Sequence, residues 1–236
     1  GASSAWDVLD DPETVFPVVM DPSGSGSQTY AVRVTQDFTK YNSDIGSTSK
    51  LGYNGWTSPY YKSRMYHQFK WHTHGGVPVP AERIVSAKFE YLQTHSPQHS
   101  CSDTDFGPTV KVQFHYVIDS STTWSNQPDA HPGIGSVTND YAVGHKDYCG
   151  NTHTQTWNVS SMVLAERYKY PTRTTVTVGI RSNDETDKNG WREYKYSSAK
   201  LTITYEAQPP APTELTVSPL IPGQGMVTNA SGVDLS

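Results

Sequence analysis

The sequence predicts an all-β protein, a two-sheet antiparallel β-sandwich of jelly-roll type with one short helix. Short segments in which polar and apolar residues alternate recur along the chain, and this alternation is typical of half-buried strands. Long polar loops separate the segments, as they do in β-sandwiches. Only 17 % of the residues are charged, while tyrosines number 15 and tryptophans 6. Such a chain is too rich in aromatic residues to be disordered, and its composition is typical of an extracellular β protein.

One strand is predicted over residues 62–71. One of its faces carries Ser63, Met65, His67, Phe69 and Trp71, and the other carries Arg64, Tyr66, Gln68 and Lys70. Residues 84–92 alternate in the same way, with Val85, Ala87, Phe89 and Tyr91 on one face. Further strands are predicted at residues 30–34, 110–117, 174–180 and 199–205.

One segment, residues 160–168, lacks alternation and begins with serine, which predicts a helix that ends before Pro171. We expect one complete domain over residues 28–206. Residues 1–27 are then the tail of a preceding segment followed by a Ser/Gly linker. Residues 207–236 are a proline-rich linker and the start of a following β domain.

Charge and motif content exclude several functions. The chain of 236 residues has a net charge of −5, so no basic field exists to bind nucleic acid. No run of about 18 apolar residues is present, so no membrane span is expected. Neither a Gly-x-Ser-x-Gly elbow, a His-Glu-x-x-His motif nor a phosphate loop occurs, and the carboxylates are scattered. The sequence therefore predicts a protein that is not an enzyme.

The two cysteines, Cys101 and Cys149, lie in polar, turn-rich segments, and neither belongs to a Cys-x-x-Cys pair. They form either two separate buried thiols or one disulfide. We favour the disulfide because of the polar surroundings. A disulfide would place the protein in an oxidising compartment, secreted or at the cell surface.

Aromatic residues gather between two predicted strands. Tyr53, Trp56, Tyr60 and Tyr61 lie in one loop that contains glycine and proline, so their rings cannot all reach the core. Exposed Trp and Tyr rings stack on the apolar face of a sugar, while nearby polar groups bond its hydroxyls. These four residues, with Arg64 from a possible basic face, are the predicted ligand-binding set. The alternative is that Trp56 caps one end of the core, and we expect Trp71, Trp157 and Trp191 in the core.

A second loop offers oxygen ligands. Asp184, Glu185, Asp187 and Asn189 half-match a calcium loop, because carboxylate and amide oxygens suit a hard cation. The match fails at its first and last positions, and an ordinary solvated hairpin loop explains the segment as well. The nine histidines suggest a zinc site or, as the plainer reading, surface and loop positions.

Several segments in order carry a family resemblance. Residues 51–56 with 63–69, residues 84–89, residues 120–128 and residues 183–191 resemble the DNRLRE domain, and Cys101 and Cys149 match cysteines frequent in its actinobacterial members. The resemblance covers residues 28–206. It implies a β-sandwich without catalytic machinery, attached to large secreted bacterial proteins such as RHS-repeat or wall-associated proteins. Some members bind acidic polysaccharides such as alginate.

Three hypotheses follow. The first is a non-catalytic extracellular binding module for a carbohydrate or cell-wall glycan within a larger secreted protein. The second is a structural spacer or assembly module of an RHS-type or polymorphic-toxin-type protein, with its aromatic residues buried against neighbouring domains and no glycan ligand. The third is an enzyme that acts on polysaccharide. A Trp56→Ala variant separates the first two, because only a binding module would lose a ligand.

Overall fold

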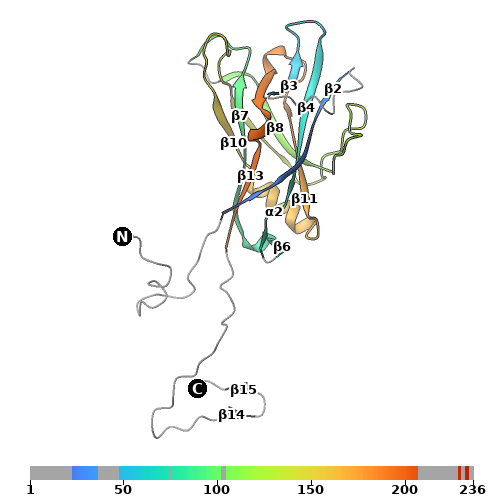
Figure 1. Cartoon of the computed structure of the whole chain (residues 1–236), viewed down its shortest axis with the longest axis vertical. Helices are drawn as coiled ribbons and strands as arrows, with labels where there is room; N and C mark the ends of the chain where they lie inside the picture. The colour runs from blue at the N-terminus through green and yellow to red at the C-terminus, as the bar shows by residue number, and fades with distance from the viewer. Residues whose placement is uncertain are drawn as a thin grey trace, which may run out of the picture.

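The structure, a computed structural model, describes residues 23–36, 48–74, 76–101 and 105–206, and the backbone of two short strands, Thr228–Asn229 and Gly232–Val233. The predicted tail over residues 1–22 lies outside the described residues. So do the predicted linker and following domain over residues 207–236, apart from those two strands. The described body is built of antiparallel strands with one α-helix (Figure 1).

The strands are β1 (Ser23–Gly26), β2 (Gln28–Thr35), β3 (Thr48–Asn54), β4 (Tyr61–Lys70), β5 (Thr73–His74), β6 (Val77–Pro78), β7 (Ile84–His95), β8 (Asp105–His115), β9 (Ser136–Tyr141), β10 (His153–Asn158), β11 (Thr175–Ser182), β12 (Arg192–Lys195) and β13 (Lys200–Tyr205). The helix is α2 (Ser160–Lys169). Short 3-10 turns cover Ala81–Arg83, Lys188–Gly190 and Tyr196–Ser198.

Eleven strands form one hydrogen-bonded sheet in the order β1-β13-β7-β12-β3-β4-β11-β8-β9, with β10 paired to β7 and β2 to β4. Strand β3 joins the two halves of the sheet, because Leu51 pairs with β12 while Gly52 pairs with β4. The sheet therefore curls around its core. The all-β class and the short helix are confirmed, and the two-sheet jelly-roll arrangement stays a prediction.

Side chains of β9 and β10 bridge these two strands at the other corner of the curled sheet. Gln155 on β10 donates through Nε2 to Asn139 Oδ1 on β9 at 2.8 Å, and Asn139 Nδ2 donates to the Thr156 carbonyl at 2.9 Å. Neighbouring strands elsewhere in the sheet are joined by backbone hydrogen bonds, whereas β9 and β10 are joined by these amide side chains. The curl is thus held at both corners, once by β3 and once by amide side chains.

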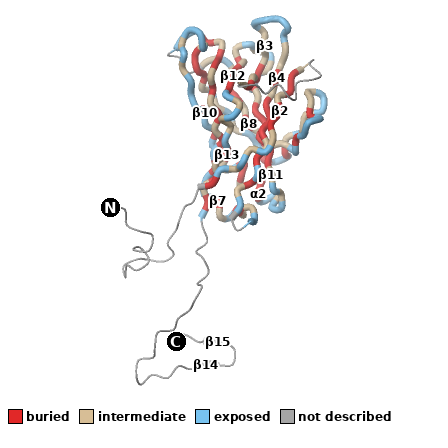
Figure 2. Tube along the Cα trace, in the orientation of Figure 1, coloured by how far each residue is buried: buried red, intermediate tan, exposed pale blue. Residues whose placement is uncertain are grey.

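The core follows the predicted alternation. The five side chains predicted to share one face of β4 and its continuation, from Ser63 to Trp71, are all buried. On β7, Ala87, Phe89 and Tyr91 are buried as expected, while Val85 is 51 % exposed and Ile84 is buried instead. The reason is a register irregularity, since Thr204 pairs with Ser86 but Tyr205 pairs with Ile84. Figure 2 shows the buried positions along the strands and the exposed ones gathered in the end loops.

The Ser/Gly segment predicted as a flexible linker is a strand over Ser23–Gly26. It pairs with β13, and Gly24 and Gly26 lie where a Cβ would stand 2.3 Å from the His72 ring and 2.5 Å from the Lys70 carbonyl oxygen. Glycine therefore serves close packing here instead of flexibility. Because Ser23 pairs with Thr204, the chain enters and leaves the described body side by side.

The helix is confirmed, and α2 extends one residue beyond the predicted end. Its first residue is not capped as the sequence suggested. Val159 holds the cap position without a side-chain bond, and Asn158 Oδ1 accepts the Ser160 N–H at 3.1 Å. The Ser160 hydroxyl instead accepts the Ala87 N–H at 2.8 Å, which ties the helix to β7.

His67 lies on β4, fully buried among aromatic rings. Its Nδ1 lies 3.0 Å from Gln28 Oε1, so the neutral ring carries its proton there and donates it. Burial lowers the pKa of His67 to about 3. The folded protein therefore holds this ring neutral at pH values where the unfolded chain protonates it.

We expect the protein to lose stability as the pH falls below about 6.5, because His67 then binds a proton in the unfolded state but not in the folded state. At pH 5 the neutral His67 lowers the free energy of unfolding by about 2 kcal/mol, from about 1.4 kcal/mol per pKa unit. Urea unfolding of the wild type and of His67→Phe at pH 7.5 and pH 5 measures it. The variant should lose about 2 kcal/mol less than the wild type over this range. Equal losses would contradict the assignment.

Candidate functional site

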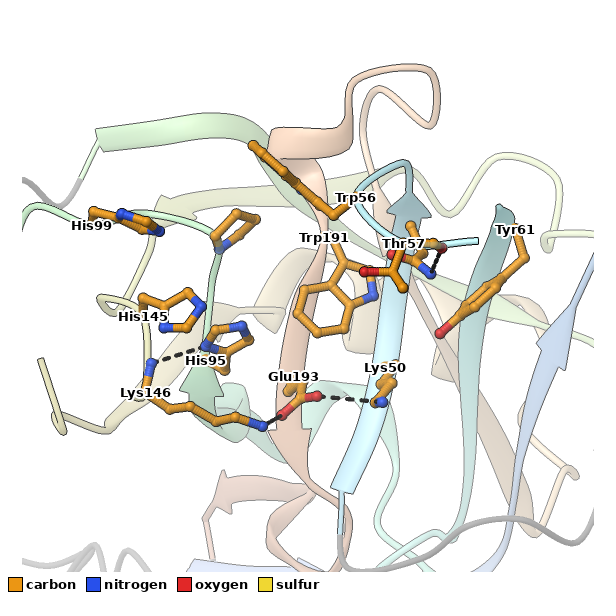
Figure 3. A pocket seen from close by; sticks show the side chains of 12 residues that line it. Lys50, Trp56, Thr57, Tyr61, His95, His99, His145, Lys146, Trp191 and Glu193 are labelled. Carbon is orange, nitrogen blue, oxygen red and sulfur yellow. Dashed lines mark hydrogen bonds and ion pairs between the residues drawn. The ribbon is translucent and has the colours of Figure 1, made fainter. Parts of the chain in front are cut away.

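A pocket of about 480 Å³ lies beside the β3–β4 hairpin (Figure 3). Four segments line it: the hairpin, the end of β7 and the residues after it, the segment around His145, and the start of β12. The lining residues are Lys50, Asn54, Trp56, Thr57, Tyr61, His95, Pro97, His99, His145, Lys146, Trp191 and Glu193.

The hairpin presents Trp56 at the pocket rim. Asn54 holds the turn through Nδ2, which donates to the Thr57 carbonyl at 3.0 Å. The Trp56 indole N–H donates to the Lys188 carbonyl at 3.0 Å, and Lys188 Nζ lies 3.9 Å from the centre of the indole ring. Trp56 is 49 % exposed, so it does not cap the core. Its ring is therefore held in place at the surface.

Trp191 lies in the middle of the pocket, between Tyr61 on one side and the histidines on the other (Figure 3). Its ring contacts His95 edge-to-face at 5.1 Å, and Lys50 Nζ lies 5.8 Å from its centre. Trp191 was expected in the core, and it lines the pocket instead, whereas Trp71 and Trp157 are buried as predicted. Burial raises the pKa of the Tyr61 phenol, so this group is neutral and able to donate.

Glu193 supplies the carboxylate of the pocket. Its side chain is only 6 % exposed, and its oxygens lie 3.5 Å from Lys50 Nζ and 3.6 Å from Lys146 Nζ. Buried carboxylates are rare unless they are paired. With two ammonium groups to one carboxylate, this part of the pocket offers both donors and acceptors and carries a small positive excess.

Three histidines form the opposite wall. His95 accepts the Lys146 backbone N–H through Nδ1 at 3.0 Å, which leaves the ring proton on Nε2. Burial lowers the pKa of His95 to about 4, although the nearby Glu193 charge opposes the shift. His145 contacts His95 edge-to-face at 4.4 Å, and His99 contacts His145 at 5.1 Å. His95 is therefore a neutral hydrogen-bonding group at pH 7.

The predicted disulfide between Cys101 and Cys149 is confirmed. It joins the segment after β7 to the segment that carries His145 and Lys146. The backbone supports the same contact, because the His145 N–H donates to the Gln98 carbonyl at 2.6 Å and the Val143 N–H to Gln93 Oε1 at 2.6 Å. The disulfide thus fixes the histidine wall of the pocket.

Of the five predicted ligand-binding residues, two line the pocket and three do not. Trp56 and Tyr61 line the pocket, Tyr60 is 61 % exposed in the turn, and Tyr53 packs beside Gly55 at the turn end of β3. Arg64 does not line the pocket.

Arg64 forms a two-pronged ion pair with Glu185 instead. The distances are 2.7 Å from Nε to Oε1 and 2.6 Å from the terminal nitrogen to Oε2. Its guanidinium also stacks 4.8 Å from the Trp124 ring centre. Arg64 and Glu185, which the sequence assigned to two different sites, therefore neutralise each other, and Arg64 serves the structure of the loops.

Several oxygens of the predicted calcium loop are engaged by Arg64 and by the loop itself. Both Glu185 oxygens face Arg64, Asp184 Oδ1 accepts from the Thr186 N–H and hydroxyl, and Asp187 Oδ1 accepts the Asn189 N–H at 2.8 Å. These bonds from Thr186 lower the pKa of Asp184. Across the described part of the chain, no three His, Cys, Asp or Glu residues converge as metal ligands would. The solvated-loop alternative explains Asp184, Asp187 and Asn189.

No sequence pattern pointed to Lys50, His145, Lys146 or Glu193, and His95 stood out only as one of the histidines near Cys101. One signal was present, because a Cys101–Cys149 bond implies that the flanking His99 and His145 lie close together. For Lys50 and Glu193, which meet only through the pairing of β3 with β12, no local signal exists.

The chain matches no known protein-family model, and no curated protein matches it. In the described residues, no helix has the length and apolar character needed to cross a bilayer.

Proposed function

We propose that this chain is a non-catalytic binding module for a carbohydrate or cell-wall glycan, secreted or displayed at the cell surface as part of a larger protein. The observation that carries the proposal is that Trp56, Trp191 and Tyr61 line the same pocket as the ion pair of Lys50 and Glu193. A pyranose has apolar faces and a rim of hydroxyls. Aromatic rings beside fixed donors and acceptors match both features at once.

The remaining parts of the proposal have their own support. The disulfide suits an oxidising compartment. The curled antiparallel sheet suits a jelly-roll domain of the DNRLRE type. Glycosidases usually act through two carboxylates about 5–9 Å apart, and Glu193 is the one carboxylate among the residues that line the described pocket. A binding role is therefore favoured over hydrolysis.

The first test is retention on immobilised polysaccharides. We expect the wild-type chain to migrate slowly in gels that contain a polysaccharide it binds, with β-glucan, xylan, polygalacturonate, alginate and soluble chitosan as probes. Trp56→Ala should lose at least about 30-fold in affinity, as a central aromatic contact does. Its fold should persist, because the side chain is half exposed and loses one surface hydrogen bond.

The matched control is Tyr168→Ala. Tyr168 is an aromatic residue on α2, is 65 % exposed and does not line the pocket. This variant should bind like the wild type. Equal retention of wild type and Trp56→Ala on a retaining polymer would contradict the proposal. A failure of the wild type to bind any polymer would favour the spacer hypothesis, in which a neighbouring domain covers Trp56.

A further inference from the structure

Two exposed aromatic residues, Tyr148 and Tyr60, adjoin residues that line the pocket. Tyr148 is 67 % exposed and comes shortly after His145 in the sequence, and Tyr60 is 61 % exposed and directly precedes Tyr61. Neither residue lines the pocket. Figure 3 shows the two walls on opposite sides of Trp191, with His99 and His145 on one side and Tyr61 on the other.

Tyr148 is held against the histidine wall. Its ring centre lies 4.5 Å from that of His99 and 4.8 Å from that of His145. Its backbone N–H donates to the His145 carbonyl at 3.0 Å, and the next residue, Cys149, is tied to Cys101. The ring therefore has a fixed place beside the pocket even though most of its surface meets water.

Tyr60 is attached to the other wall. It follows Pro59, whose carbonyl accepts from Asn54 Nδ2 at 3.4 Å, and it is followed by Tyr61, the first residue of β4. The same Asn54 side chain thus fixes the turn that carries Trp56 and Tyr60. Each flanking ring therefore belongs to a short segment that hydrogen bonds hold in shape.

We propose that the site binds an internal stretch of a linear glycan, with one sugar unit in the pocket and its neighbours on Tyr148 and Tyr60, instead of a chain end. This inference rests on the proposed function. A ligand confined to the pocket would leave both flanking rings in water. A chain that crosses the pocket covers an aromatic ring on each side, where stacking adds to the binding of the central unit.

The test compares chain lengths of the polymer that the wild type retains. Disaccharide to octasaccharide fragments of that polymer are titrated against the full chain, and affinity is measured by calorimetry. We expect affinity to rise with length until the fragment spans the pocket and both rings. Tyr148→Ala should lower affinity for the octasaccharide by about tenfold and leave the disaccharide unchanged. Tyr168→Ala is again the matched control.

Capping the reducing ends of the polymer by borohydride reduction gives the second arm, and we expect no change in retention. Equal affinity for the disaccharide and octasaccharide, or loss of retention after end reduction, would overturn internal binding while leaving the glycan-binding function intact. An unchanged octasaccharide affinity in Tyr148→Ala would overturn the role of the flanking rings. Binding to no polymer would instead refute the proposed function itself.

Discussion

Replacing Glu166 with alanine is expected to lower the free energy of unfolding by about 3 kcal/mol, because it removes one partner of a buried ion cluster. Glu166 is completely buried on α2. Its carboxylate accepts from His131 Nδ1 at 2.7 Å and lies 3.3 Å from an Arg173 nitrogen. Arg173 in turn donates to His131 Nε2 at 2.5 Å, so the neutral ring stands between the two charges.

The cluster joins α2 to the loop that carries His131. Burial raises the pKa of Glu166 to about 6 against the opposing charge of Arg173, and burial lowers the pKa of His131 to about 4. The arrangement at pH 7 is therefore a carboxylate, a neutral imidazole and a guanidinium. Without Glu166, Arg173 lacks its counter-charge and His131 Nδ1 lacks its acceptor.

Urea unfolding at pH 7 measures the effect. The control is Glu90→Ala, which breaks a more exposed ion pair to Lys88 at 2.9 Å and should cost less than about 1 kcal/mol. A loss in Glu166→Ala no larger than that of the control would show that the cluster does not stabilise the fold.

Removing the disulfide by changing Cys101 and Cys149 to serine is expected to cost about 4 kcal/mol. The bond closes a loop with a sequence separation of 48, and a loop of this size gives that value on the chain-entropy model. The same change releases the histidine wall, because His99 and His145 lie on the two segments that the disulfide joins. Glycan affinity should therefore fall as well.

Two readouts separate these effects. Thermal unfolding reports the loss of stability, and retention on a binding polysaccharide, measured well below the unfolding midpoint, reports the pocket. We expect both to be impaired in the double variant. A variant that is destabilised but binds with unchanged affinity would show that the disulfide serves the fold alone.

Local patterns predicted much of the fold. The inner faces of β4 and β7, the helix and the disulfide follow from alternation, from its absence and from cysteine surroundings. Strand β1 could not be predicted in this way, because Ser23–Gly26 has the composition of a linker and pairs only through contact with β13. A Ser/Gly composition makes the unfolded chain flexible, but packing against β13 orders this segment as a strand.

The candidate site was predicted only in part, because its polar half depends on long-range strand pairing. Trp56 and Tyr61 were identifiable because they share one short loop. Glu193 reaches Lys50 only because β12 lies beside β3, and the sequence contains no short-range trace of that register. The ion pair between Arg64 and Glu185 is equally long-range, so the sequence assigned its two members to different sites.

The most direct test of glycan binding at the pocket follows the indole N–H signals of the tryptophans by NMR during titration with an oligosaccharide from a retained polymer. The proposal predicts that the signals of Trp56 and Trp191 shift and saturate together, while those of the buried Trp71 and Trp157 stay in place. Binding that leaves the Trp56 and Trp191 signals unmoved would place the ligand elsewhere and contradict the proposed site.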